Sequence, residues 1–195
     1  MDPWILQPDW RARIALILFV ACFYTGVVVI NNELLFFWAA DTDYRYWFYP
    51  PAGVRLAIVL LLGWPGLCGY FIAILALYVG GIVLEDATFT EGFLVALGRT
   101  ASIWLALMAY GVITRVKTPW DELTWGHLPF LALFVSLVSG VVAHLVRSVL
   151  GVDQFENLVR DVALNVFGDT LGSIVVLAFI LWMRKAYREY VRTTA

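Results

Sequence analysis

The sequence predicts an all-α integral membrane protein, a bundle of about six transmembrane helices that forms a single domain over residues 1–195. Of the 195 residues, 62% are hydrophobic and only 14% are charged, and the mean hydropathy is +0.83. A soluble domain of this length carries roughly a quarter charged residues, because its surface must face water. Several segments also run for about 18 residues with few charges, the length that a bilayer core requires. No segment is polar enough to predict a soluble domain.

The apolar segments are separated by polar or helix-breaking stretches, and together they predict six membrane spans. These spans are residues 12–30, 52–63, 66–84, 92–114, 128–150 and 160–183. The second is short and begins at a proline pair, so we expect it to cross at a tilt or with help from the aromatic stretch before it. That stretch, residues 33–50, is expected to lie on the outer membrane face as an interfacial anchor or a lid.

The charges outside the spans predict the orientation of the chain. Basic residues lie beside the ends of the first, fourth and sixth spans, and six spans place these ends on one side. These residues are Arg11, Arg13, Arg115, Lys117, Arg184, Lys185, Arg188 and Arg192. Acidic residues lie on the other side: Glu33, Asp41, Asp43, Glu85, Asp86, Glu91, Asp153 and Glu156. The positive-inside rule makes the basic side cytoplasmic, so both termini are predicted to face the cytoplasm.

Six polar residues inside the spans are predicted to form one site. They are Arg55, Arg99, His144, Arg147, Asn165 and Asp169. At a rise of about 1.5 Å per residue, Arg99 lies ~24 Å and Asp169 ~22 Å above the cytoplasmic ends of their spans. Such depths belong to the outer half of a core about 30 Å thick. Because polar side chains in lipid must face the interior of a bundle, we expect one polar cavity near the outer side.

Three interpretations of this cavity stay open. In a structural interpretation, Asp169 pairs with one arginine and locks the bundle, while the other arginines reach toward lipid headgroups. In a functional one, three arginines facing one aspartate leave an excess of positive charge. Guanidinium forks suit carboxylate or phosphate, so the cavity would bind an anionic ligand or lipid headgroup from the outside. In the third, Asp169 and His144 handle protons or ions.

No catalytic site is predicted. Cys68 lies near the inner end of its span, far from the polar cluster, so it has no base to activate it. The chain has neither a glycine-rich phosphate loop nor a paired-carboxylate motif. Cys22 and Cys68 lack CxxC spacing and histidine neighbours, so neither a metal nor a cofactor is expected. The expected partners are the lipid bilayer, an anionic ligand or lipid headgroup, and a membrane or cytoplasmic protein, and not nucleic acid.

Two stretches carry a family resemblance. In "YPPAGVRLAIVLLLGWPGLCGYFIA" a proline pair and a glycine begin a helix, which ends at a glycine followed by a Pro-Gly turn. The residues that carry this pattern are Pro50, Pro51, Gly53, Ala57, Gly63, Pro65 and Gly69. In "NVFGDTLGSIVVLAFIL" a Gly-Asp pair, Gly168 and Asp169, is followed by Gly172. These stretches resemble the early and closing helices of MASE1 domains, the membrane-associated sensor modules of bacterial signalling proteins.

The resemblance implies a sensory module of the bacterial inner membrane that passes a signal to a signalling enzyme. The chain departs from the family in having six predicted spans rather than about eight and in having Arg55 at a usually apolar position. No output domain follows Arg184, so we expect a shortened, stand-alone relative that works through a partner protein. Two other functions stay open: an accessory or assembly subunit of a larger membrane complex, and a small-solute transport component.

Overall fold

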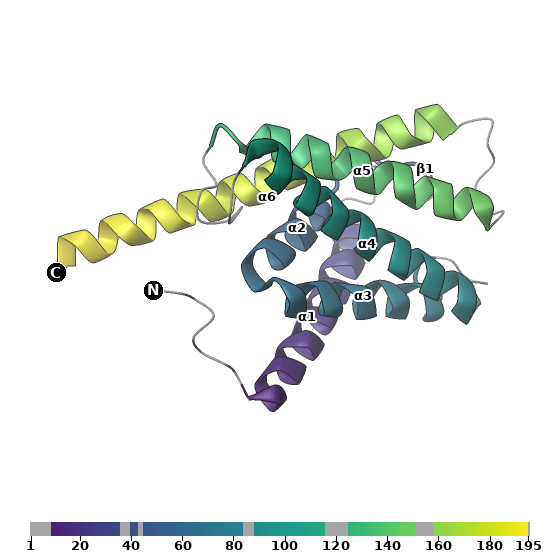
Figure 1. Cartoon of the computed structure of the whole chain (residues 1–195), viewed down its shortest axis with the longest axis horizontal. Helices are drawn as coiled ribbons and strands as arrows, with labels where there is room; N and C mark the ends of the chain where they lie inside the picture. The colour runs from purple at the N-terminus through teal and green to yellow at the C-terminus, as the bar shows by residue number, and fades with distance from the viewer. Residues whose placement is uncertain are drawn as a thin grey trace.

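The computed structural model describes residues 9–35, 40–42, 45–83, 88–115, 125–150 and 158–194, and this part of the chain is all-α apart from one small hairpin (Figure 1). Its six α-helices are α1 (Trp10–Ile30), α2 (Pro50–Leu62), α3 (Trp64–Val79), α4 (Phe89–Thr114), α5 (Leu128–Val149) and α6 (Leu158–Thr194). A π-helical turn, η1 (Asn31–Leu35), extends α1, and the strands β1 (Ala40–Thr42) and β2 (Arg45–Tyr46) pair antiparallel. The predicted all-α class is therefore confirmed.

The helix lengths and compositions suit a multi-pass membrane protein. Within the described residues, four helices are long and apolar enough to cross a membrane by themselves: α1 with η1, α4, α5 and α6. The other two, α2 and α3, have 13 and 16 residues. At about 1.5 Å per residue they measure roughly 20 and 24 Å, less than a bilayer core of about 30 Å. All six predicted spans are thus helical, but two of them are too short to cross a bilayer core as straight helices.

Two predicted span ends differ from the observed helix ends by more than one residue. The prediction for the third span ran to residue 84, but α3 ends at Val79 because two glycines follow and Gly81 adopts a φ of 70°. The last span was predicted to end at residue 183, but α6 continues to Thr194. The added segment contains no glycine or proline, so nothing in it breaks the helix. It forms a polar, basic extension of the apolar span.

The predicted break between the second and third spans is confirmed at Gly63, the single residue between α2 and α3. Gly63 has φ 58° and ψ −128°, a conformation that residues with a Cβ avoid. Pro65 follows in the first turn of α3, where its missing N–H would have no helical partner in any case. The two helices are therefore joined by a sharp turn.

Five helices close a ring. Helices α3, α4, α5 and α6 run side by side along the long axis of the molecule (Figure 1). Helix α2 packs against α3 on one side and α6 on the other, and α1 packs on α3 and also touches α2. Eight of the 13 residues of α2 are consequently buried. A short helix at membrane depth is tolerated when protein surrounds it in this way.

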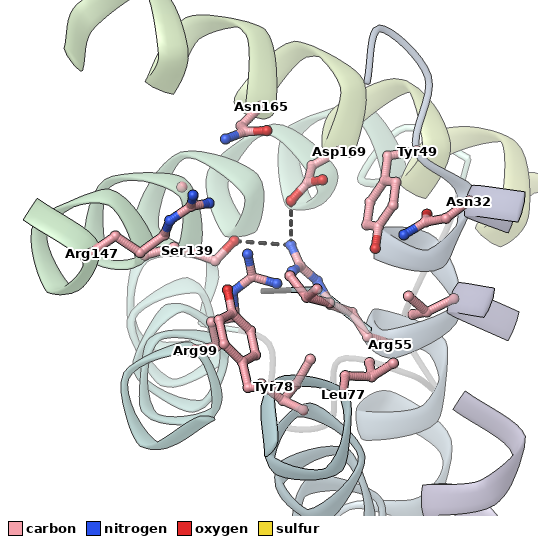
Figure 2. A pocket seen from close by; sticks show the side chains of 15 residues that line it. Asn32, Tyr49, Arg55, Leu77, Tyr78, Arg99, Ser139, Arg147, Asn165 and Asp169 are labelled. Carbon is pink, nitrogen blue, oxygen red and sulfur yellow. Dashed lines mark hydrogen bonds and ion pairs between the residues drawn. The ribbon is translucent and has the colours of Figure 1, made fainter. Parts of the chain in front are cut away.

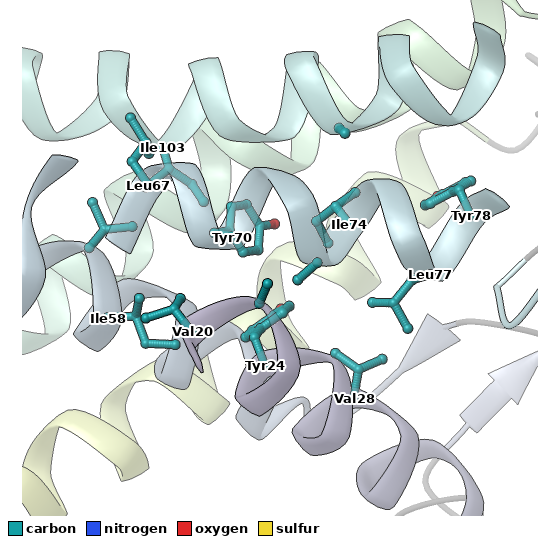
Figure 3. Close-up of a cluster of buried hydrophobic side chains, with 14 of the residues drawn as sticks. Val20, Tyr24, Val28, Ile58, Leu67, Tyr70, Ile74, Leu77, Tyr78 and Ile103 are labelled. Carbon is teal, nitrogen blue, oxygen red and sulfur yellow. The ribbon is translucent and has the colours of Figure 1, made fainter. Parts of the chain in front are cut away.

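Two apolar clusters hold the ring together. The first joins α1, α2, α3 and α4, and Figure 3 shows Tyr24 and Tyr70 close to one another in it. Their ring centroids are 5.0 Å apart in an edge-to-face arrangement, which is favourable for aromatic pairs. The second cluster joins α2, α4, α5 and α6, and its members Leu56, Leu131 and Leu177 are all fully buried. The clusters thus fix α2 from both sides.

The two motif stretches meet where α2 begins beside α6. The Tyr49 N–H donates a hydrogen bond of 3.1 Å to the Gly168 carbonyl. A Cβ on Gly172 would fall on the Tyr49 carbonyl, and a Cβ on Gly53 would lie 2.6 Å from the Cβ of Val176. Only glycine at these positions lets the two backbones approach so closely. This contact sets the position of the first turn of α2, which begins at Pro50 and Pro51.

Candidate functional site

A cavity of about 60 Å³ lies inside the ring, with room for about two water molecules at roughly 30 Å³ each. It lies where α1, α3 and α5 end and where α2 and α6 begin. Its wall contains three arginines and one carboxylate: Arg55, Arg99, Arg147 and Asp169. Figure 2 shows these side chains pointing toward a shared space from α2, α4, α5 and α6.

The structure brings five of the six predicted site residues into the cavity wall: Arg55, Arg99, Arg147, Asn165 and Asp169. The sixth, His144, is buried behind the wall, and its Nε2 lies 2.6 Å from the Nδ2 of Asn165. This contact fixes the Asn165 amide between α5 and α6.

Arg55 forms an ion pair and a further hydrogen bond at the cavity. Its Nη2 lies 2.5 Å from Oδ2 of Asp169 and donates a second bond of 3.1 Å to Oγ of Ser139. The Arg55 and Asp169 side chains are only 6% and 14% exposed. Taking an unpaired charge out of water costs several kcal/mol, so each group stabilises the other. This pairing explains an arginine in α2, because it ties α2 to α6 and α5.

Arg99 faces the same cavity without such compensation. Among the described residues, no carboxylate forms an ion pair with its guanidinium, and its buried Nε has no hydrogen-bond partner. The Nε of Arg55 is also unbonded, but the charge of Arg55 is balanced by Asp169. The charge of Arg99 therefore remains available to a group that enters the cavity.

Tyr78 lies beside Arg99 on the α3 side of the cavity (Figure 2). The residue is 4% exposed, and within the described part of the chain its hydroxyl has no hydrogen-bond partner. Buried hydroxyl groups normally have a partner, supplied by protein, water or ligand. Together with Arg99, Tyr78 gives this wall polar groups for which the described part of the chain supplies no partner.

Arg147 lies in the last turn of α5, where the helix dipole favours a cation. It lines the cavity and takes part in other interactions as well. The three arginines therefore differ: Arg55 is paired with Asp169, Arg147 has contacts of its own, and Arg99 has no carboxylate among the described residues.

Tyr49, Tyr78 and Ser139 line the cavity but were not among the predicted site residues. Ser139 could have been predicted from helical periodicity, because it lies about two turns before Arg147 and so shares its face of the helix. Tyr78 could have been predicted for another reason: it lies inside an apolar span, where its hydroxyl needs a hydrogen-bond partner.

The fold and the cavity define this chain as a multi-pass membrane protein with a buried, arginine-rich polar site. No family model matches the chain, and neither does any curated protein or solved structure. The resemblance to MASE1 domains consequently depends on the motif residues alone.

Proposed function

We propose that this chain is a sensory module of the bacterial inner membrane that binds an anionic group in the cavity and signals through a partner protein. The observation that carries the proposal is Arg99, which lines the cavity and forms no ion pair with a carboxylate among the described residues. The carboxylate of the cavity wall, Asp169, is already paired with Arg55. The positive charge of Arg99 suits a carboxylate or phosphate group, because one guanidinium group can bind two of its oxygens at once.

The place of the cavity in the bundle supports access from outside the cell. Basic residues lie at the opposite end: Arg11 and Arg13 at the start of α1, Arg115 after α4, and four more at the end of α6. The positive-inside rule then assigns both termini to the cytoplasm. This orientation is the same whether α2 and α3 each cross the membrane or form a re-entrant pair, because both arrangements return the chain to the outer side before α4.

The sensory role is supported by the MASE1 resemblance and by the course of α6. This helix contacts α2 beside the cavity and continues without interruption to Thr194. A shift of a packed helix at one end is carried to its other end when the helix moves as a unit. A change in the packing of α6 against α2 would therefore move the other end of α6, where a cytoplasmic partner could bind.

Native mass spectrometry of the full chain in mild detergent tests the proposal. The wild-type protein is expected to bind at least one of three probes: acetate, inorganic phosphate or dioctanoyl phosphatidylglycerol. Arg99→Gln should lose this binding, whereas Arg11→Gln, which changes an exposed arginine at the other end, should keep it. A wild-type protein that binds none of the probes would show that the anion-binding proposal is wrong.

A second candidate is an accessory subunit of a membrane complex. It is favoured by the Arg55, Asp169 and Ser139 set, which links three helices without any ligand. In that case the same spectra should show a partner protein at fixed stoichiometry. Arg99→Gln should then leave the bound molecules unchanged.

A further inference from the structure

The two sides of the cavity differ in how far the described residues balance their own charge. On the α2 and α6 side, Arg55 and Asp169 neutralise each other, although the Nε of Arg55 has no hydrogen-bond partner among the described residues. On the α3 and α4 side, the buried Nε of Arg99 and the hydroxyl of Tyr78 have no hydrogen-bond partner among the described residues. Buried donors of this kind are unfavourable unless water or a ligand bonds to them. The unsatisfied side is therefore where an incoming group gains most.

We infer that Arg99 and Tyr78 form the oxyanion subsite of the cavity and that it takes a group with one negative charge shared over two oxygens, a carboxylate or a phosphate diester. This inference rests on the proposed function, and it specifies where in the cavity the anion binds and what its chemistry is. The guanidinium fork presents two parallel N–H donors to such a pair of oxygens. The Tyr78 hydroxyl donates a further bond to one of them.

The single charge follows from the neighbouring groups. Asp169 balances Arg55, and Arg147 already takes part in other interactions. Arg99 is then the charge that the ligand must balance, and a second buried negative charge without a partner would be strongly unfavourable. A cavity of about 60 Å³ has room for the charged group but not for a whole lipid. The rest of a larger molecule would extend from the mouth of the cavity.

Two substitutions with a matched control test the subsite. Tyr78→Phe removes only the hydroxyl, and Arg99→Gln removes the charge. Tyr110→Phe is the control, because Tyr110 is as deeply buried and its hydroxyl is also unbonded among the described residues, but it lies in the second apolar cluster and not in the cavity wall. Each variant is purified as the full chain in mild detergent, with its thermal unfolding recorded to verify the fold.

Affinity is measured by calorimetry for acetate and inorganic phosphate, and by native mass spectrometry for dioctanoyl phosphatidylglycerol. Tyr78→Phe should weaken binding about tenfold or more, as for loss of a hydrogen bond to a charged group. Arg99→Gln should abolish binding, and Tyr110→Phe should leave it unchanged. If Arg99→Gln does not fold, the affinities of Tyr78→Phe and Tyr110→Phe are sufficient to test the subsite.

The results separate the source of the anion from the location of its site. If only the lipid binds, the natural ligand is a lipid headgroup. If only acetate or phosphate binds, the ligand is a free anion. If both kinds of probe bind, the site recognises the anionic group that they share. An affinity that is unchanged by Tyr78→Phe overturns the subsite while the proposed function stands, and loss of binding in Arg147→Gln would then place the anion elsewhere in the cavity. A wild-type chain that binds no probe overturns both.

Discussion

Removing one partner of the buried pair between Arg55 and Asp169 should destabilise the protein strongly. Arg55→Met keeps most of the side-chain volume but leaves Asp169, only 14% exposed, without its cation. Loss of one partner of a buried ion pair costs about 3–5 kcal/mol. The lost hydrogen bond to Ser139 adds about 1 kcal/mol. Because Asp169 borders the cavity and can be hydrated there, we expect the lower part of the combined range, a loss of about 4–5 kcal/mol.

A double variant distinguishes the ion pair from simple packing. Arg55→Met combined with Asp169→Leu removes both charges, and apolar replacement of a buried pair is often neutral or stabilising. The double variant should therefore be more stable than either single variant, by about 2 kcal/mol or more. Lys185→Met is the control, because Lys185 and Glu189 form an exposed pair at 3.9 Å, and such pairs contribute little.

Reversible unfolding in mixed micelles, followed by tryptophan fluorescence, supplies the free energies for this double-mutant cycle. The expected order of stability is wild type and Lys185→Met together, then the double variant, then the two single variants. The ion-pair argument is refuted if Arg55→Met unfolds with the wild-type free energy, or if the two single losses simply add in the double variant.

Two further predictions concern the helix contacts. Gly172→Ala should destabilise the protein by about 1–3 kcal/mol or more, because the added methyl group meets the backbone of Tyr49. Gly26→Ala, whose methyl group would have nothing within 4 Å, should be neutral or stabilising by up to about 1 kcal/mol. Equal unfolding midpoints for the two variants would contradict the close approach of α2 and α6. Thr88→Ala removes the capping box in which Thr88 Oγ1 accepts a 3.3 Å bond from the Glu91 N–H. It should cost about 1 kcal/mol and speed amide exchange in the first turn of α4, and unchanged exchange there would count against the cap.

The helices and much of the cavity wall were predictable because a bilayer leaves few alternatives. Apolar runs must be helical there, since each backbone group has to bond within its own segment. A constant rise per residue then ranks polar side chains by depth, and polar side chains must turn inward. These rules placed Arg99, Asn165 and Asp169 together although they lie on two different helices.

The choice of partner for Asp169 was not predictable by the same rules. All three arginines are predicted to lie in the outer half of the bilayer core, and periodicity along one helix says nothing about which helix lies beside it. Arg55 pairs with Asp169 because α2 begins against the backbone of α6 at Gly168 and Gly172. This contact joins residues more than a hundred positions apart. The end of α3 was missed for a local reason, since the positive φ of Gly81 stops a helix that hydropathy alone would continue.

The proline pair, the close glycine contact and Arg55 together account for the charge of the cavity. The contact at Gly172 sets α2 against α6, and Arg55, about one turn further along α2, then reaches the carboxylate of Asp169. With Asp169 occupied in this way, Arg99 has no carboxylate partner among the described residues. If α2 carried an apolar residue instead, Asp169 would be free to balance the charge of Arg99, and the positive charge open to a ligand would shrink. On the proposed function, Arg55 therefore acts without touching the ligand: it engages the carboxylate of the cavity and leaves Arg99 to bind the anion.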